Sequence, residues 1–306
     1  ARTLETLCPG QVIYYMASYW PAEIDAHTAY WADEAANPWL RLPKKVAGQL
    51  VRRFFITSAP RNQLDFRLVL CVSEYMRRTI VAQAGIPDGQ TRVVYNGIDP
   101  QAFPMRAMNT TSGMTRLLYA GRLSPDKGVH IVVKALGHLK QIQPNVPICL
   151  SIVGAGAPEY KAYLHQLVEQ ENVADWIQFR PRVPREEMAN VLSAHDVLIF
   201  SSIWPEPLAR MVQEAMACGL VVIGTTTGGT PEILRDGENG LTYPAEDAVV
   251  LAKKIEEIVI DSDMRCRLAL AARQTVEKQF TTDRMIDELE MYFKQIWEDA
   301  RDGNAE

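Results

Sequence analysis

Residues 197–223 read VLIFSSIWPEPLARMVQEAMACGLVVI, and this stretch decides the fold. It holds two apolar runs of strand length, Val197 to Phe200 and Leu220 to Ile223, on either side of a helical pattern from Pro207 to Cys218. Pro207 suits the first helical position, where its missing N–H is not needed. A strand, a helix and a second strand in this order are typical of a parallel sheet covered by helices.

Two carboxylates, Glu206 and Glu214, bracket the start of this helix. Glu206 is expected in the loop and Glu214 about two turns into the helix, up to about 12 Å apart along the chain. That separation is too large for sharing one proton, but it suits gripping the two ends of an elongated ligand. The helix N-terminus between them favours an anion. Carboxylates for hydroxyls with an anion site between them suggest a nucleotide sugar as ligand.

The composition is that of an ordinary globular protein. The chain has 306 residues, 47% hydrophobic and 23% charged, which is ample for two cores. The formal net charge of -5 argues against nucleic acid as a partner. No run approaches the roughly 18 apolar residues of a membrane span, and neither a membrane span nor a signal peptide is expected from this sequence. The five scattered cysteines have no metal-binding spacing and predict free thiols in a reducing, cytoplasmic compartment.

Strands and helices alternate from Arg116 onward, and this predicts a parallel sheet with helices on both faces. The predicted strands are Leu117 to Ala120, Ile148 to Val153, Ile177 to Phe179, Val197 to Phe200 and Val221 to Ile223. The predicted helices between them are Val129 to Ile142, Glu159 to Glu171, Arg185 to Ser193 and Pro207 to Cys218. Ligands of such sheets bind at the carboxyl ends of the strands.

The remainder of the chain shows a similar but shorter pattern. Predicted strands are Val12 to Met16, Leu68 to Val72 and Val93 to Tyr95, and Ser73 is expected to cap a helix that runs to Gln83. Residues 100–114 are polar and read as a linker. Three helical patterns close the chain: Ala245 to Ile260, Met264 to Gln279 and Asp283 to Arg301. Phe293 and Trp297 are expected to anchor the last of them.

The segment from Leu118 to Gly128 is a strand, a glycine turn and two cations placed before a helix. Gly121 would let the backbone approach a ligand closely. Arg122 and Lys127 could reach one polyanion from two sides. An ordinary solvated surface loop is the alternative interpretation, because this pattern alone is only moderately specific.

Taken in order, these motifs resemble the donor domain of the retaining family-four glycosyltransferases. The resemblance covers roughly residues 65 to 300 and implies an α/β GT-B fold, two Rossmann-like doubly wound domains facing a cleft. It implies a partial acceptor-side domain at 1–103, a nucleotide-sugar donor-binding domain at 104–282, and a C-terminal helix, 283–301, that packs back on the first domain. Further matching segments are Val94 to Asp99, Val153 to Gly156, His195 to Val197, Gly228 to Glu232 and Asn239 to Leu241.

The resemblance also implies roles for individual residues. Arg122 and Lys127 match the pair that holds the donor diphosphate, Glu214 the carboxylate that binds the ribose hydroxyls, and Glu206 the carboxylate near the transferred sugar. Arg122, Lys127 and Glu206 are therefore the expected catalytic residues. Further expected donor-binding residues are Gly121 and Gly154 in the glycine turns, the backbone N–H groups of Leu208 and Ala209, and Phe179, Arg180 and Val183 near the base.

One departure from the family pattern concerns the loop after Glu206. The family places an aromatic or small residue and then Gly there, whereas this chain has Pro207, Leu208 and Ala209. Alanine is small enough for close backbone approach, so donor binding is expected to survive. Arg210 could add a phosphate contact or serve as a solvated helix charge.

Other functions find less support in the sequence. The glycines at 154 and 156 lack the third small residue of a dinucleotide fingerprint, because position 159 is Glu. The five histidines lack metal-ligand spacing, and no Asp-x-Asp pair suits a metal-bound diphosphate. No metal and no cofactor are therefore expected besides the nucleoside diphosphate sugar. A basic, aromatic stretch at 41–55 could contact the inner face of a membrane or could be a solvated helix.

The N-terminal domain looks incomplete, because a GT-B first domain normally has about seven strands and this sequence offers about three. Truncation, a partner chain that completes the domain and a trimmed fold are the interpretations that remain open. The family's acceptor-side His has no counterpart after Met16. Ser18, Tyr19, Asp25 and His27 are the nearby candidates for that role.

The sequence thus predicts a metal-independent glycosyltransferase (EC 2.4, hexosyltransferase type). It would move a sugar, with retention, from a nucleoside diphosphate sugar to an acceptor hydroxyl. A UDP-sugar is favoured by family resemblance alone, and polysaccharide, lipopolysaccharide and glycolipid acceptors are all compatible. The alternative is a non-catalytic nucleotide-sugar-binding module that needs a partner chain.

Overall fold

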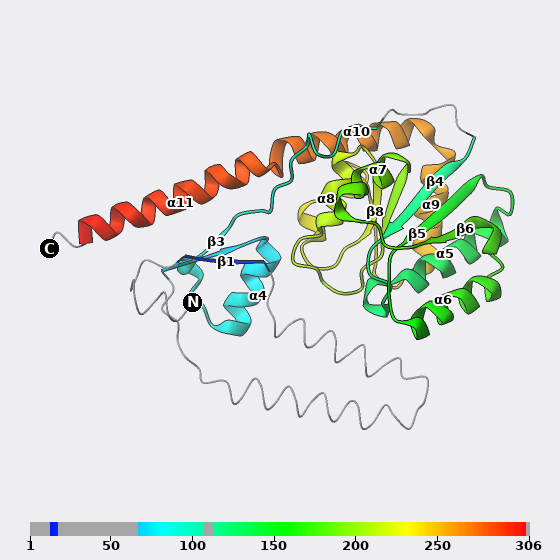
Figure 1. The fold of residues 1–306 in the computed structure, drawn as a ribbon, viewed down its shortest axis with the longest axis horizontal. Helices are drawn as coiled ribbons and strands as arrows, with labels where there is room; N and C mark the ends of the chain where they lie inside the picture. The colour runs from blue at the N-terminus through cyan, green and yellow to red at the C-terminus, as the bar shows by residue number, and fades with distance from the viewer. Residues whose placement is uncertain (1–12, 18–66, 107–112, 304–306) are drawn as a thin grey trace, which may run out of the picture. The chain divides into compact units, whose positions relative to one another are not determined.

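The computed structural model describes residues 13–17, 67–106 and 113–303. The chain folds into two compact units, of which the first comprises residues 1–95 with 285–306 and the second residues 96–284. Each unit contains its own parallel sheet (Figure 1). This α/β architecture agrees with the one that the sequence predicts.

The second unit is built on a six-stranded parallel sheet in the order β6-β5-β4-β7-β8-β9. The strands are β4 (Thr115–Ala120), β5 (Ile148–Val153), β6 (Ile177–Arg180), β7 (Val197–Phe200), β8 (Val221–Thr225) and β9 (Leu241–Tyr243). From β4 the chain winds outward through β5 to β6, and it then returns to β7 on the other side of β4. The order of the strands therefore reverses between β4 and β7. Five of the strands were predicted, and β9 was missed because three residues are too short for an alternation pattern.

Helices cover both faces of this sheet (Figure 1). They are α5 (Val129–Ile142), α6 (Pro158–Gln170), α7 (Met188–Ser193), α8 (Arg210–Ala217), α9 (Ala248–Ile260) and α10 (Ser262–Gln279). Alternate strand residues, such as Leu117, Tyr119, Leu150 and Ile152, share one buried cluster with α5, α6 and α9. Because side chains alternate along a strand, the opposite face is left for the remaining helices, and α8 packs against α7 and α10.

The prediction that Pro207 is the first helical residue was wrong. Helix α8 begins at Arg210, with Ala209 in an extended conformation as its N-cap. Tertiary hydrogen bonds hold the preceding loop in a non-helical path: the Trp204 N–H donates to the Asp126 carbonyl and the Gly229 N–H donates to the Glu206 carbonyl. Glu214 therefore lies about one turn into the helix, not two.

The first unit contains a three-stranded parallel sheet within the described residues, in the order β1-β2-β3. The strands are β1 (Ile13–Met16), β2 (Leu68–Cys71) and β3 (Thr91–Val93), and the helices are α4 (Glu74–Ala84) and α11 (Thr282–Gly303). Ser73 caps α4 as predicted, because its Oγ accepts from the Met76 N–H at 3.1 Å. The prediction for the third strand, Val93 to Tyr95, was two residues too late, since the strand starts directly after the 3₁₀ turn Asp88–Gln90.

Helix α11 packs into the first unit with one apolar stripe. Ile296 is buried with Leu68, Leu70 and Val94, and Met285, Leu289 and Tyr292 pack against the same cluster. Phe293 and Trp297 are 55% and 71% exposed, so the expectation that they anchor the helix was wrong. The residues that do anchor it, Met285, Leu289, Tyr292 and Ile296, are spaced by three or four positions and so share one face of the helix.

The segment 96–103 packs with the second unit, although the sequence analysis placed it in the first domain. The Ile98 N–H donates to the Phe280 carbonyl at 2.9 Å, and the Thr282 N–H donates to the Ile98 carbonyl at 3.0 Å. Arg273 Nη1 donates to the Phe103 carbonyl at 2.6 Å. These bonds join the segment to residues that are distant in sequence, which composition alone does not reveal.

None of the helices in the described residues is both long enough and apolar enough to span a membrane.

Candidate donor-binding site

The point where the strand order reverses carries the candidate site. Gly121 follows the carboxyl end of β4, and Ser201 follows the carboxyl end of β7. Two adjoining cavities of about 620 Å³ and 220 Å³ open here, and Gly121, Arg122 and Met211 line both. Open parallel sheets bind ligands at this location, because the loops after β4 and β7 diverge there.

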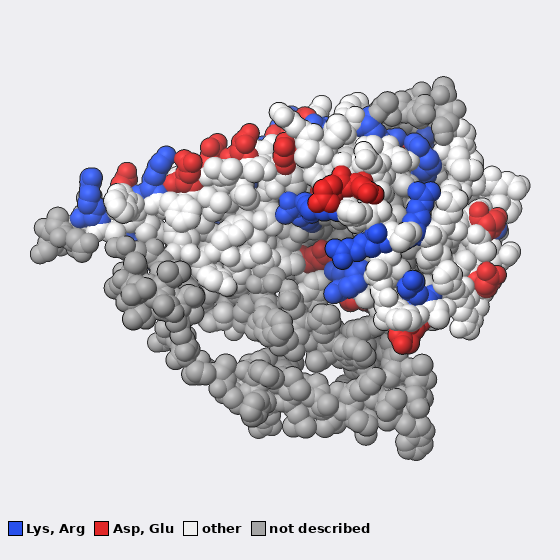
Figure 2. Space-filling view, viewed as in Figure 1, with Lys and Arg blue, Asp and Glu red and all other residues white. Residues whose placement is uncertain are grey.

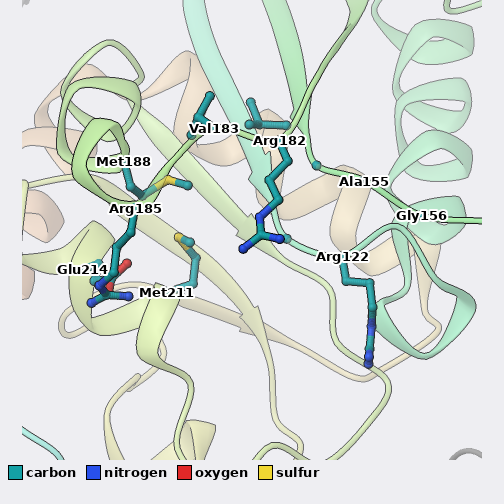
Figure 3. Close-up of a pocket in the computed structure, with 12 residues that line it drawn as sticks. Arg122, Ala155, Gly156, Arg182, Val183, Arg185, Met188, Met211 and Glu214 are labelled. Carbon is teal, nitrogen blue, oxygen red and sulfur yellow. The ribbon is translucent and has the colours of Figure 1, made fainter.

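The larger cavity extends from the glycine turns to helix α8 (Figure 3). Its lining residues are Gly121, Arg122, Val153, Gly154, Ala155, Gly156, Arg182, Val183, Arg185, Met188, Met211 and Glu214. The smaller cavity reaches the carboxyl end of β7 and is lined by Lys127, Glu206 and Ser202, among others. Charged side chains of both signs therefore border the cavities.

An ion pair joins the loops after β4 and β7. Lys127 Nζ lies 2.8 Å from Glu206 Oε1, with the two side chains 19% and 23% exposed. The Lys127 carbonyl accepts from Ser201 Oγ at 2.8 Å, which fixes the turn that carries the lysine. Partial burial shields the pair from water, so its charges act more strongly on a ligand than surface charges would.

Arg122 is hydrogen-bonded to the same turn. Its Nη2 donates to Asp126 Oδ2 at 3.0 Å, and its Nε donates to Ser124 Oγ at 3.2 Å. Its carbonyl accepts from the Tyr119 hydroxyl at 2.7 Å. Burial raises the pKa of Tyr119 well above its usual value, so the hydroxyl keeps its proton and holds the turn at ordinary pH.

Glu214 is the most buried charge of the larger cavity, with a side chain only 4% exposed. Its Oε1 accepts from Arg185 Nη2 at 2.9 Å and from Arg210 Nε at 3.3 Å. These two hydrogen bonds offset part of the cost of burying the carboxylate. It can accept hydrogen bonds from ligand hydroxyls at the cavity wall.

Glycines allow the loops to approach one another closely. A Cβ on Gly154 would lie 2.0 Å from the Gly121 carbonyl oxygen, and a Cβ on Gly156 would lie 2.0 Å from that of Leu123. Gly128 has φ +67°, and its Cβ would lie 2.0 Å from the Ser201 carbonyl oxygen. Any larger residue would therefore push apart the loops that form the site.

The N-terminus of α8 offers backbone donors. The amide N–H groups of residues 208–211 make no hydrogen bonds within the described part of the chain. Leu208 and Ala209 are buried, at 7% and 0% exposure. Free N–H groups at a helix start, together with the helix dipole, favour an anion.

Family models match both parts of the chain. The model described as "Glycosyl transferases group 1" matches residues 106–275, and "Glycosyltransferase Family 4" matches residues 26–102. The chain belongs to the glycosyl transferases group 1 family. Its resemblance to glycosyltransferases is thereby confirmed at the level of the family.

Individual relatives agree with this assignment. Spore coat protein SA of Bacillus subtilis (strain 168) is 31% identical over 242 residues, which cover 72% of this chain and 63% of that protein. Glycogen synthase of Mycobacterium tuberculosis is 28% identical over 235 residues, covering 77% of this chain and 55% of that protein. The chain thus spans a little more than half the length of these curated relatives.

Solved structures show that the fold is GT-B. Anabaena HepE in complex with UDP and glucose superposes with a TM-score of 0.70 at 22% identity, covering 95% of this chain and 73% of that chain. Sucrose-phosphate synthase from Thermosynechococcus elongatus superposes with a TM-score of 0.71 at 23% identity, covering 94% of this chain and 68% of that chain.

The structure brings many of the predicted residues to the cavities. Gly121, Arg122, Lys127, Gly154, Val183, Glu206 and Glu214 all line one cavity or the other. Phe179 and Arg180 do not: Phe179 packs on His165 with ring centroids 4.2 Å apart, and Arg180 Nη2 donates to Gln178 Oε1 at 3.1 Å. Ser18, Tyr19, Asp25 and His27 lie outside the described residues, as does the basic stretch 41–55.

Sequence reasoning missed Arg182, Arg185, Met188 and Met211 as cavity residues. Arg185 and Met188 follow β6 in the 3₁₀ turn and helix that the sequence predicts as one helix, so their side chains looked like solvated or core positions. The signal available was the density of arginines at 180, 182 and 185 directly after a strand. In the described part of the chain, no cluster of His, Cys, Asp and Glu could hold a metal ion.

Proposed function

We propose that the protein transfers a sugar from a nucleoside diphosphate sugar to an acceptor hydroxyl. The observation that carries this proposal is the grouping of Lys127, Glu206, Arg122 and Glu214 around adjoining cavities at the strand-order reversal. Cations beside free helix N–H groups suit a diphosphate, and buried carboxylates suit sugar hydroxyls.

In this proposal each group takes one part of the donor. Arg122, Lys127 and the N–H groups at the start of α8 bind the diphosphate. Glu214 accepts hydrogen bonds from the ribose hydroxyls, and Glu206, held 2.8 Å from Lys127 Nζ, binds near the transferred sugar. Val183 lines the end of the cavity that would receive the base.

The proposed mechanism depends on where charge develops on the donor during sugar transfer. When the bond from the sugar to the diphosphate breaks, negative charge grows on the leaving phosphate and positive charge on the sugar ring. Cations and helix N–H groups fixed in advance stabilise the first without reorganising, and Glu206 faces the second. We propose that the acceptor proton passes to the departing phosphate on the same face of the sugar, which gives retention without a protein nucleophile. In this mechanism no metal is required.

The donor and the pathway are finer points of the proposal. HepE was solved with UDP and glucose, and that precedent supports a UDP-sugar donor. Acceptors in polysaccharide, lipopolysaccharide or glycolipid synthesis suit a cytoplasmic enzyme that can work at the inner face of a membrane. The basic stretch 41–55 would make that contact.

Calorimetric titration with UDP, GDP and ADP tests the donor site. We expect one nucleotide to bind at micromolar strength, about -8 kcal/mol, and both Arg122→Ala and Glu214→Ala to weaken it about tenfold or more. Lys253→Ala, on the exposed face of α9, is the control and should leave binding unchanged. Absence of binding by all three nucleotides would contradict the proposal.

A second candidate is a non-catalytic nucleotide-sugar-binding module. It is favoured by one observation: the predicted donor contacts that line the cavities all lie in the second unit. Such a module would depend on a partner chain for catalysis. Sugar transfer or donor hydrolysis by the chain alone, measured by nucleotide release, would exclude it.

A further inference from the structure

Three arginines line the larger cavity, and the protein itself pairs two of them. Arg122 Nη2 lies 3.0 Å from Asp126 Oδ2, and Arg185 Nη2 lies 2.9 Å from Glu214 Oε1. Arg182 makes no hydrogen bond or ion pair within the described residues. A cation that borders a cavity without an internal carboxylate partner is available to an anionic ligand.

The backbone around Arg182 is constrained. Pro181 directly precedes it and Pro184 follows two residues later, and each proline fixes its own φ near -65°. The Arg180 carbonyl accepts from the Gly154 N–H at 3.2 Å, which ties this segment to the glycine turn of the cavity. In Figure 3 the Arg182 side chain extends into the space between Arg122 and the pair formed by Arg185 and Glu214.

The formal charges at the cavities indicate a role for Arg182. Lys127 cancels Glu206, and Arg122 cancels Asp126. Glu214 with Arg185 and Arg210 leaves one positive charge, and Arg182 raises the formal total to two. A nucleoside diphosphate sugar carries one negative charge on each of its phosphates near neutral pH, so Arg182 completes the match.

Lys and Arg side chains gather on the face of the second unit that carries α7 and α8, beside a group of acidic side chains (Figure 2). Arg180 and Arg182 are both exposed, but they differ in their surroundings. Arg180 is hydrogen-bonded to Gln178 and does not line the cavity, whereas Arg182 lines it. Substituting each arginine in turn therefore compares a cation that lines the cavity with a surface cation two residues away.

We propose that Arg182 binds the donor diphosphate, between Arg122 and the carboxylate that holds the ribose. This assignment rests on the proposed function, because it requires a nucleoside diphosphate in the cavity. The planar guanidinium can donate two parallel hydrogen bonds to phosphate oxygens, which a lysine ammonium cannot reproduce. The sequence analysis expected the neighbouring Arg180 near the base; the proposal instead gives Arg182 a contact with the diphosphate.

The test compares a nucleotide with its nucleoside. The ligands are whichever of UDP, GDP and ADP the unaltered chain binds most tightly, measured by calorimetry, and the matching nucleoside, measured by ligand-observed NMR. We expect Arg182→Ala to weaken the nucleotide about tenfold or more and the nucleoside less than about twofold. Arg180→Ala, the matched control, should change neither, and Arg182→Lys should recover only part of the loss.

Each alternative outcome has a definite meaning. Equal weakening of nucleotide and nucleoside by Arg182→Ala would place the residue at the base or ribose and overturn the assignment. An unchanged nucleotide affinity, with Arg182→Gln giving the same result, would also overturn it, while the proposed function would stand on the binding seen with the unaltered chain. If the unaltered chain binds no nucleotide, the proposed function fails and this assignment fails with it.

Discussion

At the scale of single residues, Asp196 shows how a buried charge is stabilised. It directly precedes β7, its side chain is 8% exposed, and Arg106 Nη1 lies 2.7 Å from its Oδ1. Arg116 adds its backbone N–H at 2.8 Å and its Nε at 3.1 Å. Each removes part of the cost of burying a carboxylate. The network joins the segment before β4 to the segment before β7.

Asp196→Asn should destabilise the protein strongly, because it leaves the Arg106 guanidinium, whose side chain is only 6% exposed, without its counter-charge. We expect a loss of about 3–5 kcal/mol in the free energy of unfolding, measured by urea titration. Asp175→Asn is the control, since that carboxylate is 64% exposed in its pair with Lys140. Equal effects of the two substitutions would contradict the prediction.

The same residue predicts a dependence on acid. Burial alone would raise the pKa of Asp196, but the hydrogen bonds from Arg116 and the charge of Arg106 outweigh burial and lower it below 3.8. Because the pKa is lower in the folded chain, the stabilisation is fully present above about pH 4 and disappears as the pH falls further. In Asp196→Asn this part of the pH dependence should be absent from urea titrations below pH 4.

At the scale of elements, the turn before α5 positions the candidate catalytic lysine. The 3₁₀ turn Pro125–Lys127 ends at Gly128, whose φ of +67° reverses the chain into α5. A Cβ at Gly128 would meet the Ser201 carbonyl oxygen, so the loops after β4 and β7 fit together only with glycine there.

Gly128→Ala should therefore cost more than backbone strain. Gly85, the C-cap of α4, has a similar φ of +69° but nothing within 4 Å of its Cβ, so Gly85→Ala is a matched control that reports strain alone. We expect about 1 kcal/mol for Gly85→Ala. A larger loss is expected for Gly128→Ala, together with weaker nucleotide binding. Equal losses in urea titration, with unchanged nucleotide binding, would show that the close approach has no energetic consequence.

The contact between α5 and α6 predicts a second pH effect. Burial, with a smaller contribution from the charge of Lys134, lowers the pKa of His130 on α5 to about 4, and its Nδ1 lies 3.0 Å from the Tyr160 hydroxyl on α6. In the unfolded chain the His130 ring therefore binds a proton near pH 6.5, whereas in the folded chain it binds one only near pH 4. Stability should fall by about 3 kcal/mol across this range.

Urea titrations between pH 7 and pH 4 measure this predicted fall in the free energy of unfolding. His130→Gln should remove most of the decline, and His138→Gln, on the same helix, serves as the control. An unchanged decline in His130→Gln would show that the ring is not the group responsible.

At the scale of the whole molecule, the two units have separate cores and the candidate donor site belongs to one of them. Every residue that lines the two cavities lies in residues 96–284. In the proposed function the second unit binds the donor and the first unit binds the acceptor. Nucleotide binding by the second unit alone tests the first part of this proposal.

Residues 96–284 expressed alone should unfold cooperatively and bind the nucleotide within about tenfold of the affinity of the full chain. The six-stranded sheet with helices on both faces gives this segment a complete core. Circular dichroism during thermal unfolding and calorimetric titration provide the measurements. A segment that folds but binds no nucleotide, while the full chain binds it, would show that the first unit contributes to the donor site.

The sequence alone determined the α/β class, most strands of the second unit, the Ser73 cap and four charged residues that line the cavities: Arg122, Lys127, Glu206 and Glu214. These features depend on local periodicity and on residue types that chemistry selects, such as the apolar run of β7 or the pair Arg122 and Lys127. Only the tertiary structure decided that α8 begins at Arg210, that 96–103 joins the second unit, and that Arg182 rather than Arg180 lines the cavity. The reason is that hydrogen bonds between residues far apart in sequence, such as the bond from Gly154 to Arg180, fix where a loop runs, and no local pattern encodes them.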